Sequence, residues 1–136
     1  MTEKQGNVTL FTLNWIDKYS NDLKGKSGLY QLYGDSPIYG RNQLLYIGQT
    51  KDLKTRPEEH EELKRINGLS VRYALCSIED LDFIESLLIV THKPSYNSQC
   101  LIAPKAIKTG TLSYLYNEGE RGSLVLEVSN YYWCWD

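Results

Sequence analysis

Glu85 is the residue whose position most calls for a chemical explanation. Residues 81–90 have helical spacing, with an apolar stripe formed by Leu81, Ile84 and Leu88. The opposite, polar face is formed by Glu79, Asp82 and Ser86. Glu85 falls at the edge of the stripe, where a carboxylate loses hydration unless a cation or a metal compensates. Two interpretations stay open: a border glutamate that reaches water, and a metal ligand.

Arg56 and His60 are a second candidate pair. They are four residues apart and share one face of the helix that residues 55–65 predict. This helix begins with a capping box, Thr55-Arg56-Pro57-Glu58, and ends at Asn67-Gly68. A guanidinium beside the free N–H groups of a helix start is suited to bind phosphate. The alternative is an exposed arginine paired with a neighbouring glutamate.

The charge of the chain limits how it could bind nucleic acid. Lys and Arg number 15 against 17 Asp and Glu, which gives a net charge of −2. This balance excludes a strongly basic coat protein, so any attraction to phosphate must be local. The segment 51–56 is such a local excess, because Lys51, Lys54 and Arg56 outnumber its single aspartate.

Length and composition describe an ordinary globular chain. The 136 residues, 41% hydrophobic and 24% charged, suit one domain with a substantial core. No apolar run approaches the roughly 20 residues of a membrane span, and residues 1–7 do not resemble a secretory signal. We therefore expect a cytoplasmic protein with no membrane partner. Cys76, Cys100 and Cys134 are far apart, which indicates separate reduced thiols.

The elements that must position these residues can be read along the chain. Apolar spacing over 9–23 predicts an amphipathic helix that ends near Gly25. Strands over 28–33 and 43–48 predict an antiparallel hairpin, residues 69–77 a third strand, and residues 79–92 an apolar helix. After a loop over 98–112, a second hairpin (114–128) and an aromatic tail (131–135) follow. The fold class expected is α+β, with a small three-stranded, mostly antiparallel sheet flanked by helices, an added N-terminal helix and a C-terminal hairpin.

Read together, these residues resemble the GIY-YIG nuclease family. Gly28-Leu29-Tyr30 and Tyr46-Ile47-Gly48 stand where that family has its two tripeptides. Further matches, in order and at family spacing, are Arg56, His60, Glu85 and the closing segment Lys93-Pro94-Ser95-Tyr96-Asn97. Any one tripeptide is a weak signal, whereas six positions in order are a strong one. The resemblance covers residues 26–98, a catalytic core, and leaves 1–25 and 99–136 as extensions of the same single domain.

Three positions depart from the family pattern. The 15 residues from Gln31 to Leu45 form a longer connection between the tripeptides, which a longer hairpin tip can absorb. Gln49 stands where many members have a lysine, so a cation that could lower a tyrosine pKa is missing. Pro57 directly follows the arginine, and the capping box explains how a helix tolerates it.

The resemblance implies metal-dependent hydrolysis of DNA by water. It implies one Mg²⁺ or Mn²⁺ per site on Glu85, charge neutralisation by Arg56, and Tyr30 or Tyr46 as the base. The resemblance does not decide between the two tyrosines; we favour Tyr30 because Gln49 denies Tyr46 its nearest cation. The other residues it implies are His60, Asn97, the motif glycines Gly28 and Gly48, and the DNA-binding Lys51, Lys54 and Arg56. The family leaves open whether Asn97 holds a loop or positions a ligand.

Two alternatives to catalysis stay open at this point. One is a non-catalytic module that keeps the fold to bind nucleic acid or protein. The other is a partner or dimer surface on the aromatic tail, against which stands simple packing of the tail in the core. The sequence does not indicate which DNA sequence or structure is cleaved.

Overall fold

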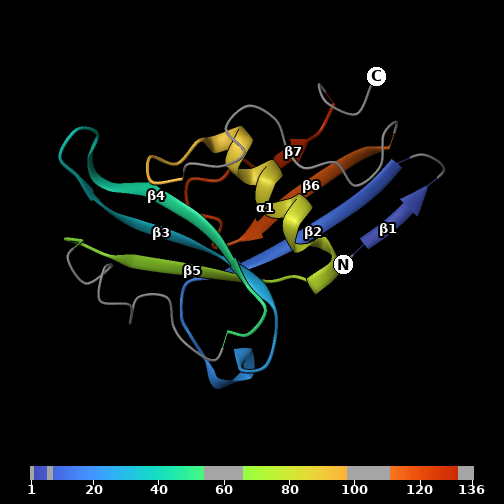
Figure 1. Cartoon of the computed structure of the whole chain (residues 1–136), viewed down its shortest axis with the longest axis horizontal. Coiled ribbons are helices and arrows are strands. Elements are labelled where there is room, and N and C mark those ends of the chain that lie inside the picture. The colour runs from blue at the N-terminus through green and yellow to red at the C-terminus, as the bar shows by residue number, and fades with distance from the viewer. Residues whose placement is uncertain (1, 6–7, 54–65, 98–110, 132–136) are drawn as a thin grey trace.

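A twisted, mixed β-sheet is the main feature of the computed structural model, which describes residues 2–5, 8–53, 66–97 and 111–131 (Figure 1). In this part of the chain seven strands form one sheet. They are β1 (Thr2–Gln5), β2 (Val8–Ile16), β3 (Gly28–Ser36), β4 (Gly40–Thr50), β5 (Ser70–Leu75), β6 (Leu112–Gly119) and β7 (Glu127–Ser129). A short 3₁₀ turn, η1 (Asn21–Leu23), lies between β2 and β3.

The strand order is β4-β3-β5-β2-β6-β7, and β1 pairs with β2 outside this path. Neighbouring strands are antiparallel except β2 and β6, which are parallel from Val8↔Leu112 to Trp15↔Gly119. The β3–β4 hairpin forms one end of the sheet, and its tip extends beyond α1 (Figure 1). The two tripeptides therefore lie on the last two strands at that end.

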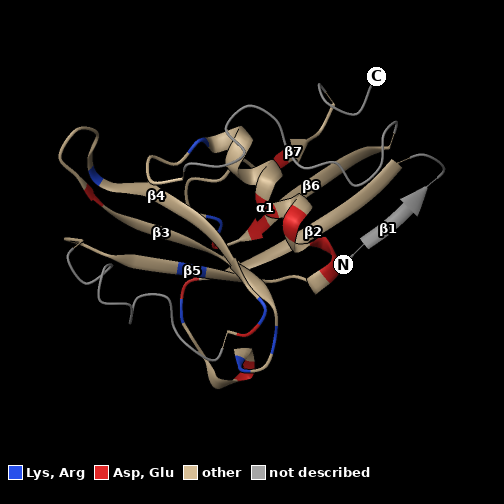
Figure 2. Ribbon diagram, in the orientation of Figure 1, with Lys and Arg blue, Asp and Glu red and all other residues tan. Residues whose placement is uncertain are grey.

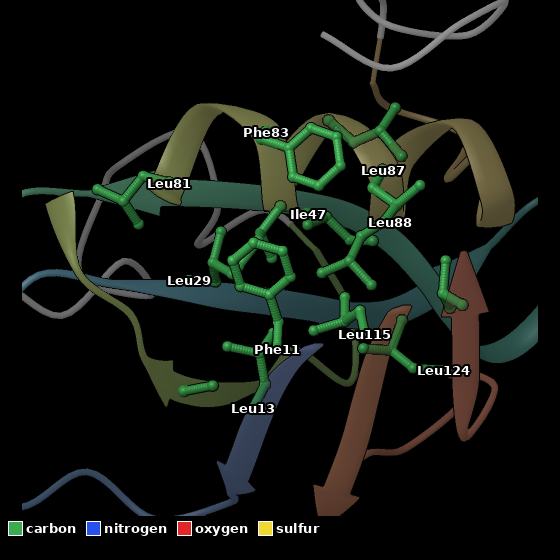
Figure 3. Packing of buried hydrophobic residues seen from close by; sticks show 14 of the residues in the cluster. Phe11, Leu13, Leu29, Ile47, Leu81, Phe83, Leu87, Leu88, Leu115 and Leu124 are labelled. Atoms are coloured by element: carbon green, nitrogen blue, oxygen red, sulfur yellow. The ribbon is translucent and has the colours of Figure 1, made fainter. Parts of the chain in front are cut away.

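Helix α1 (Ile78–His92) covers one face of the sheet and is the one α-helix of the described residues. Figure 3 shows its apolar side chains pointing onto those of the strands. The buried contacts include Phe11, Leu13, Leu29, Ile47, Leu81, Phe83, Leu87, Leu88 and Leu115. Ser86 is also buried, and its hydroxyl donates to the carbonyl of Phe83 at 2.7 Å, so its assignment to a polar face is wrong. The helix is buried on most sides, which periodicity alone does not reveal.

A second apolar cluster lies on the other face of the sheet. Its members are Leu23, Leu32, Leu53, Val71 and Tyr73, with Tyr30 and Tyr46 packed against them. Side chains alternate between the two faces of a strand, so Tyr30 and Leu32 join this cluster while Leu29 contributes to the core under α1. The candidate site is thus built on strands that are packed from both faces.

The predicted N-terminal helix over residues 9–23 is wrong. Residues 8–16 form β2, in which Thr9, Phe11, Leu13 and Trp15 are buried and the residues between them are not. This is the two-residue period of a strand, in a segment rich in β-branched and aromatic residues. β2 then gains a partner about 100 residues away, β6, which local spacing could not indicate.

The expected three-stranded sheet flanked by helices is also wrong. The strands predicted at 28–33, 43–48 and 69–77 are present, but the sheet continues through β2, β6 and β7. The residues of the C-terminal hairpin do pair antiparallel, and β6 lies against β2 as an inner strand. Their side chains add Leu115 and Val128 to the core beneath α1.

Several expectations fall outside the described residues. These are the helix over 55–65, most of the loop over 98–112 and the tail beyond Tyr131. Among the helices of the described residues, none has the length and apolar character needed to cross a membrane.

Candidate active site

The two motif tyrosines lie side by side because the hairpin brings their strands into register. Tyr30 pairs across the ladder with Gly48, and Leu32 pairs with Tyr46. The ring centroids of Tyr30 and Tyr46 are 6.1 Å apart, with their planes tilted by 36°. This spacing is within the range of favourable aromatic pairs. The two hydroxyl-bearing rings therefore form one unit of the site.

Gly48 makes room for this unit. A Cβ at Gly48 would lie 2.4 Å from both Cζ and Oη of Tyr30 and 2.7 Å from Cε2 of Tyr46. The Tyr30 ring thus lies across the backbone of its partner strand. Gly28 has a different reason: a Cβ there would lie 2.4 Å from the carbonyl oxygen of Ala74 on β5. Gly48 therefore leaves space for the two tyrosine rings, and Gly28 leaves space for the backbone of β5.

Both phenols are held neutral in this arrangement. Burial, and after it the neighbouring Tyr46 and the Glu85 carboxylate, together raise the pKa of Tyr30 to about 12. Burial and Glu85 also raise the pKa of Tyr46 above its usual value. Glu85 therefore lies close enough to both tyrosines to act on their ionisation. Neither phenol is a base without a cation that opposes these effects.

The carboxylate of Glu85 contacts Gln49, the residue after the second tripeptide. The Nε2 of Gln49 donates to Oε1 of Glu85 at 3.1 Å and to Oδ1 of Asp82 at 2.8 Å. Glu85 is half-buried, as expected for the edge of the apolar stripe. Residues 46 and 49 lie on opposite faces of β4. Gln49 nevertheless contacts the Glu85 carboxylate that acts on Tyr46, so the effect of a missing cation at position 49 stays a prediction. A lysine at 49 would extend toward α1.

Asn97 closes the edge of the motif hairpin. Its Oδ1 accepts from the N–H of Ile47 and its Nδ2 donates to the carbonyl of Ile47, each at 3.0 Å. The N–H of Tyr96 also donates to the carbonyl of Leu45 at 2.8 Å. β4 is an outer strand of the sheet, and these contacts satisfy backbone groups that its edge would leave unpaired. The Lys93–Asn97 segment thereby ties the end of α1 to β4.

The cations of the candidate site are only partly described. Lys54, Arg56 and His60 lie outside the described residues. Lys51 is exposed just beyond β4 and lines an open cleft of about 590 Å³ at the start of α1. Lys26 lines the same cleft, together with the apolar Phe11, Leu13 and Ile84. Sequence reasoning missed Lys26, because only the fold brings residue 26 next to residue 51.

The donor set around Glu85 suits Mg²⁺ or Mn²⁺ better than a metal that needs many protein ligands. Mg²⁺ keeps several waters and binds proteins through one or two carboxylates. Figure 2 shows acidic residues along the first half of α1, where Asp82 and Glu85 lie one turn apart. No group of three or more His, Cys, Asp or Glu gathers within the described ranges. The residues present fit an ion held mainly by Glu85 and water.

Cys76 is the one cysteine of the described residues, and its thiol is free. Burial and the nearby Asp80 raise its pKa to about 12. A thiol with such a pKa is neutral at physiological pH and a poor nucleophile.

The arrangement brings together two phenols and one carboxylate, with a second carboxylate, Asp82, that sequence reasoning placed only on the polar face of its helix. The signal for Asp82 was its spacing of three residues from Glu85. Such a set can bind a hydrated divalent cation and hold a phosphodiester near hydroxyl groups.

Comparisons of the chain with models of protein families, with curated proteins and with solved structures find no match.

Proposed function

We propose that this chain is a metal-dependent endonuclease that hydrolyses DNA phosphodiester bonds by in-line attack of water, as its resemblance to the GIY-YIG nucleases implies. The observation that carries the proposal is the tyrosine pair over Gly48, with Glu85 close enough to raise the pKa of both phenols. These residues come from β3, β4 and α1, and they are the ones that the family motifs require together.

Glu85 is the residue that would hold the divalent cation, with water completing its coordination. A bound Mg²⁺ or Mn²⁺ supplies polarisation of the phosphate and stabilisation of the leaving oxygen. Arg56 supplies a guanidinium for the charge that develops on the phosphoryl oxygens. Lys51 and Lys26, which line one cleft beside α1, are suited to bind flanking phosphates of the DNA.

Tyr30 or Tyr46 accepts the proton of the attacking water. With a pKa of about 12, the neutral form of Tyr30 exceeds the ionised form by about five powers of ten at pH 7. Burial is the largest cause of the raised pKa, and the negative charge of Glu85 adds to it in both phenols, so neutralising that charge removes this one contribution from both. This couples cation binding at Glu85 to the basicity of the tyrosines. Arg56, His60 and Lys51 are the further cations available for the same purpose.

The test is a cleavage assay with Mg²⁺ on duplex, branched and single-stranded DNA. We expect Glu85→Ala to abolish Mg²⁺-dependent cleavage and Tyr30→Phe to slow it by about two or more powers of ten, the usual scale for a general base. Glu79→Ala is the matched control, because Glu79 is an exposed glutamate of the first turn of α1. Wild-type cleavage by Glu85→Ala, with circular dichroism showing an intact fold, would refute the proposal.

One observation favours a second candidate, a nucleic-acid-binding module without catalysis. The described residues raise the pKa of both tyrosines, whereas a base needs a lower one. Under this alternative the cleft with Lys26 and Lys51 binds DNA while no substrate is cleaved. Retention of labelled DNA in gel-shift assays, with no product under any metal condition, distinguishes this module from the nuclease.

A further inference from the structure

Gln49 makes a direct polar contact with Glu85. Its amide nitrogen has two N–H groups, and it donates to Asp82 at 2.8 Å and to Glu85 at 3.1 Å. Gln49 pairs across the ladder with Leu29, whose side chain lies in the core beneath α1. The glutamine therefore reaches α1 from the face of β4 that the helix covers. Its side chain links the strand of the second tripeptide to the helix of the candidate ligand.

The contact with Asp82 determines how the amide is oriented. Asp82 is exposed and Glu85 is half-buried, one turn further along α1. A glutamine with one donor bond can rotate about its terminal torsion, whereas two bonds to carboxylates one turn apart fix both the torsion and the identity of the donor atom. The amide adds no charge beside Glu85, in contrast to the lysine that many members of the resembled family have at this position.

We propose that Gln49 is a positioning residue that holds the Glu85 carboxylate in place for the divalent cation, and that Asp82 anchors the Gln49 amide. The inference rests on the proposed function, because that function supplies the cation. A polar residue behind a ligating carboxylate typically changes metal affinity by about 10- to 100-fold when it is removed. Asp82 acts here through Gln49, as an acceptor whose charge is not required.

The distinction between an anchor and a ligand gives the experiment its design. Asp82→Asn keeps an acceptor oxygen for the Gln49 amide and removes the charge, whereas Asp82→Ala removes both. Gln49→Met keeps the length of the side chain and removes the donor. Gln43→Met is the matched control, because Gln43 lies on the same strand and its amide donates to the carbonyl of Arg41.

The measurement is Mn²⁺ binding to the full chain without DNA, from the electron paramagnetic resonance signal of free Mn²⁺. We expect Gln49→Met to weaken binding about 10-fold and Asp82→Ala to weaken it by a smaller factor. Asp82→Asn and Gln43→Met should bind as the unchanged protein does, and Glu85→Gln should lose the site.

Each deviation from this pattern is decisive. Unchanged or tighter Mn²⁺ binding by Gln49→Met would overturn the positioning role. A large loss in Asp82→Asn would overturn the anchor role and make Asp82 a direct ligand. If the unchanged protein binds Mn²⁺ with this pattern yet cleaves no DNA, the positioning role stands and the nuclease proposal fails. If the unchanged protein does not bind Mn²⁺, the metal site fails and the inference fails with it.

Discussion

Replacing Gly48 with alanine tests directly whether the Tyr30 ring depends on the bare backbone of β4. The added Cβ would lie 2.4 Å from Cζ and Oη of Tyr30, about 1 Å closer than ordinary van der Waals contact. The clash involves the middle of a packed strand pair, so the ring must move by about that amount. Overpacking of this kind costs about 1–3 kcal/mol of the free energy of unfolding, offset by up to about 1 kcal/mol because alanine orders more easily than glycine. We expect a net loss of about 1–2 kcal/mol in urea unfolding.

A double-mutant cycle identifies the cause of that loss. In a Tyr30→Ala background the ring is absent, so Gly48→Ala should cost less by about 1 kcal/mol or more. Cleavage by Gly48→Ala should fall by about 100-fold, because a displacement of about 1 Å in a reacting group has that effect. Equal costs of Gly48→Ala in both backgrounds would refute the claim that the glycine exists to accommodate Tyr30.

Two further predictions concern the edge of β4 and the end of α1. Asn97→Ala should lower the free energy of unfolding by about 1–3 kcal/mol, because the N–H and C=O of Ile47 lose their partners. Asn97→Asp keeps the acceptor, so its stability should fall between those of the unchanged protein and Asn97→Ala. Equal stability of all three proteins in urea would contradict a stabilising role of the two Asn97–Ile47 hydrogen bonds. At His92, Nδ1–H donates to the carbonyl of Leu88 while Nε2 accepts from the N–H of Val125, and burial lowers the pKa of the ring. The unfolded chain therefore binds the proton more readily, so stability is present above about pH 6.5 and is lost as the pH falls below that value. His92→Gln should flatten this dependence in thermal melts between about pH 7 and 5, and an unchanged slope would show that another group carries it.

The local sequence determined the motif hairpin, the strand that follows it and helix α1. Each has a strong local signal: two glycine-bounded strands with a turn between them, an apolar strand, and a helix that ends before a proline. Helical spacing alone placed Glu85 at the border of the apolar stripe, where it is half-buried, but the same spacing placed the buried Ser86 on the polar face. The family motifs gave the expectation that Tyr30, Tyr46 and Glu85 act together.

The tertiary structure decided what these elements pack against. Residues 8–16 carry leucines at helical spacing and buried residues at strand spacing, and the pairing with β6 and β5 selects the strand. The direction of Gln49 and its bond to Asp82 follow from the side of β4 that α1 covers. The cleft shared by Lys26 and Lys51 exists only because the turn after η1 returns to the end of β4, where the N–H of Leu53 donates to the carbonyl of Lys26. Contacts between residues far apart in the chain depend on the whole sheet, and no local pattern encodes them.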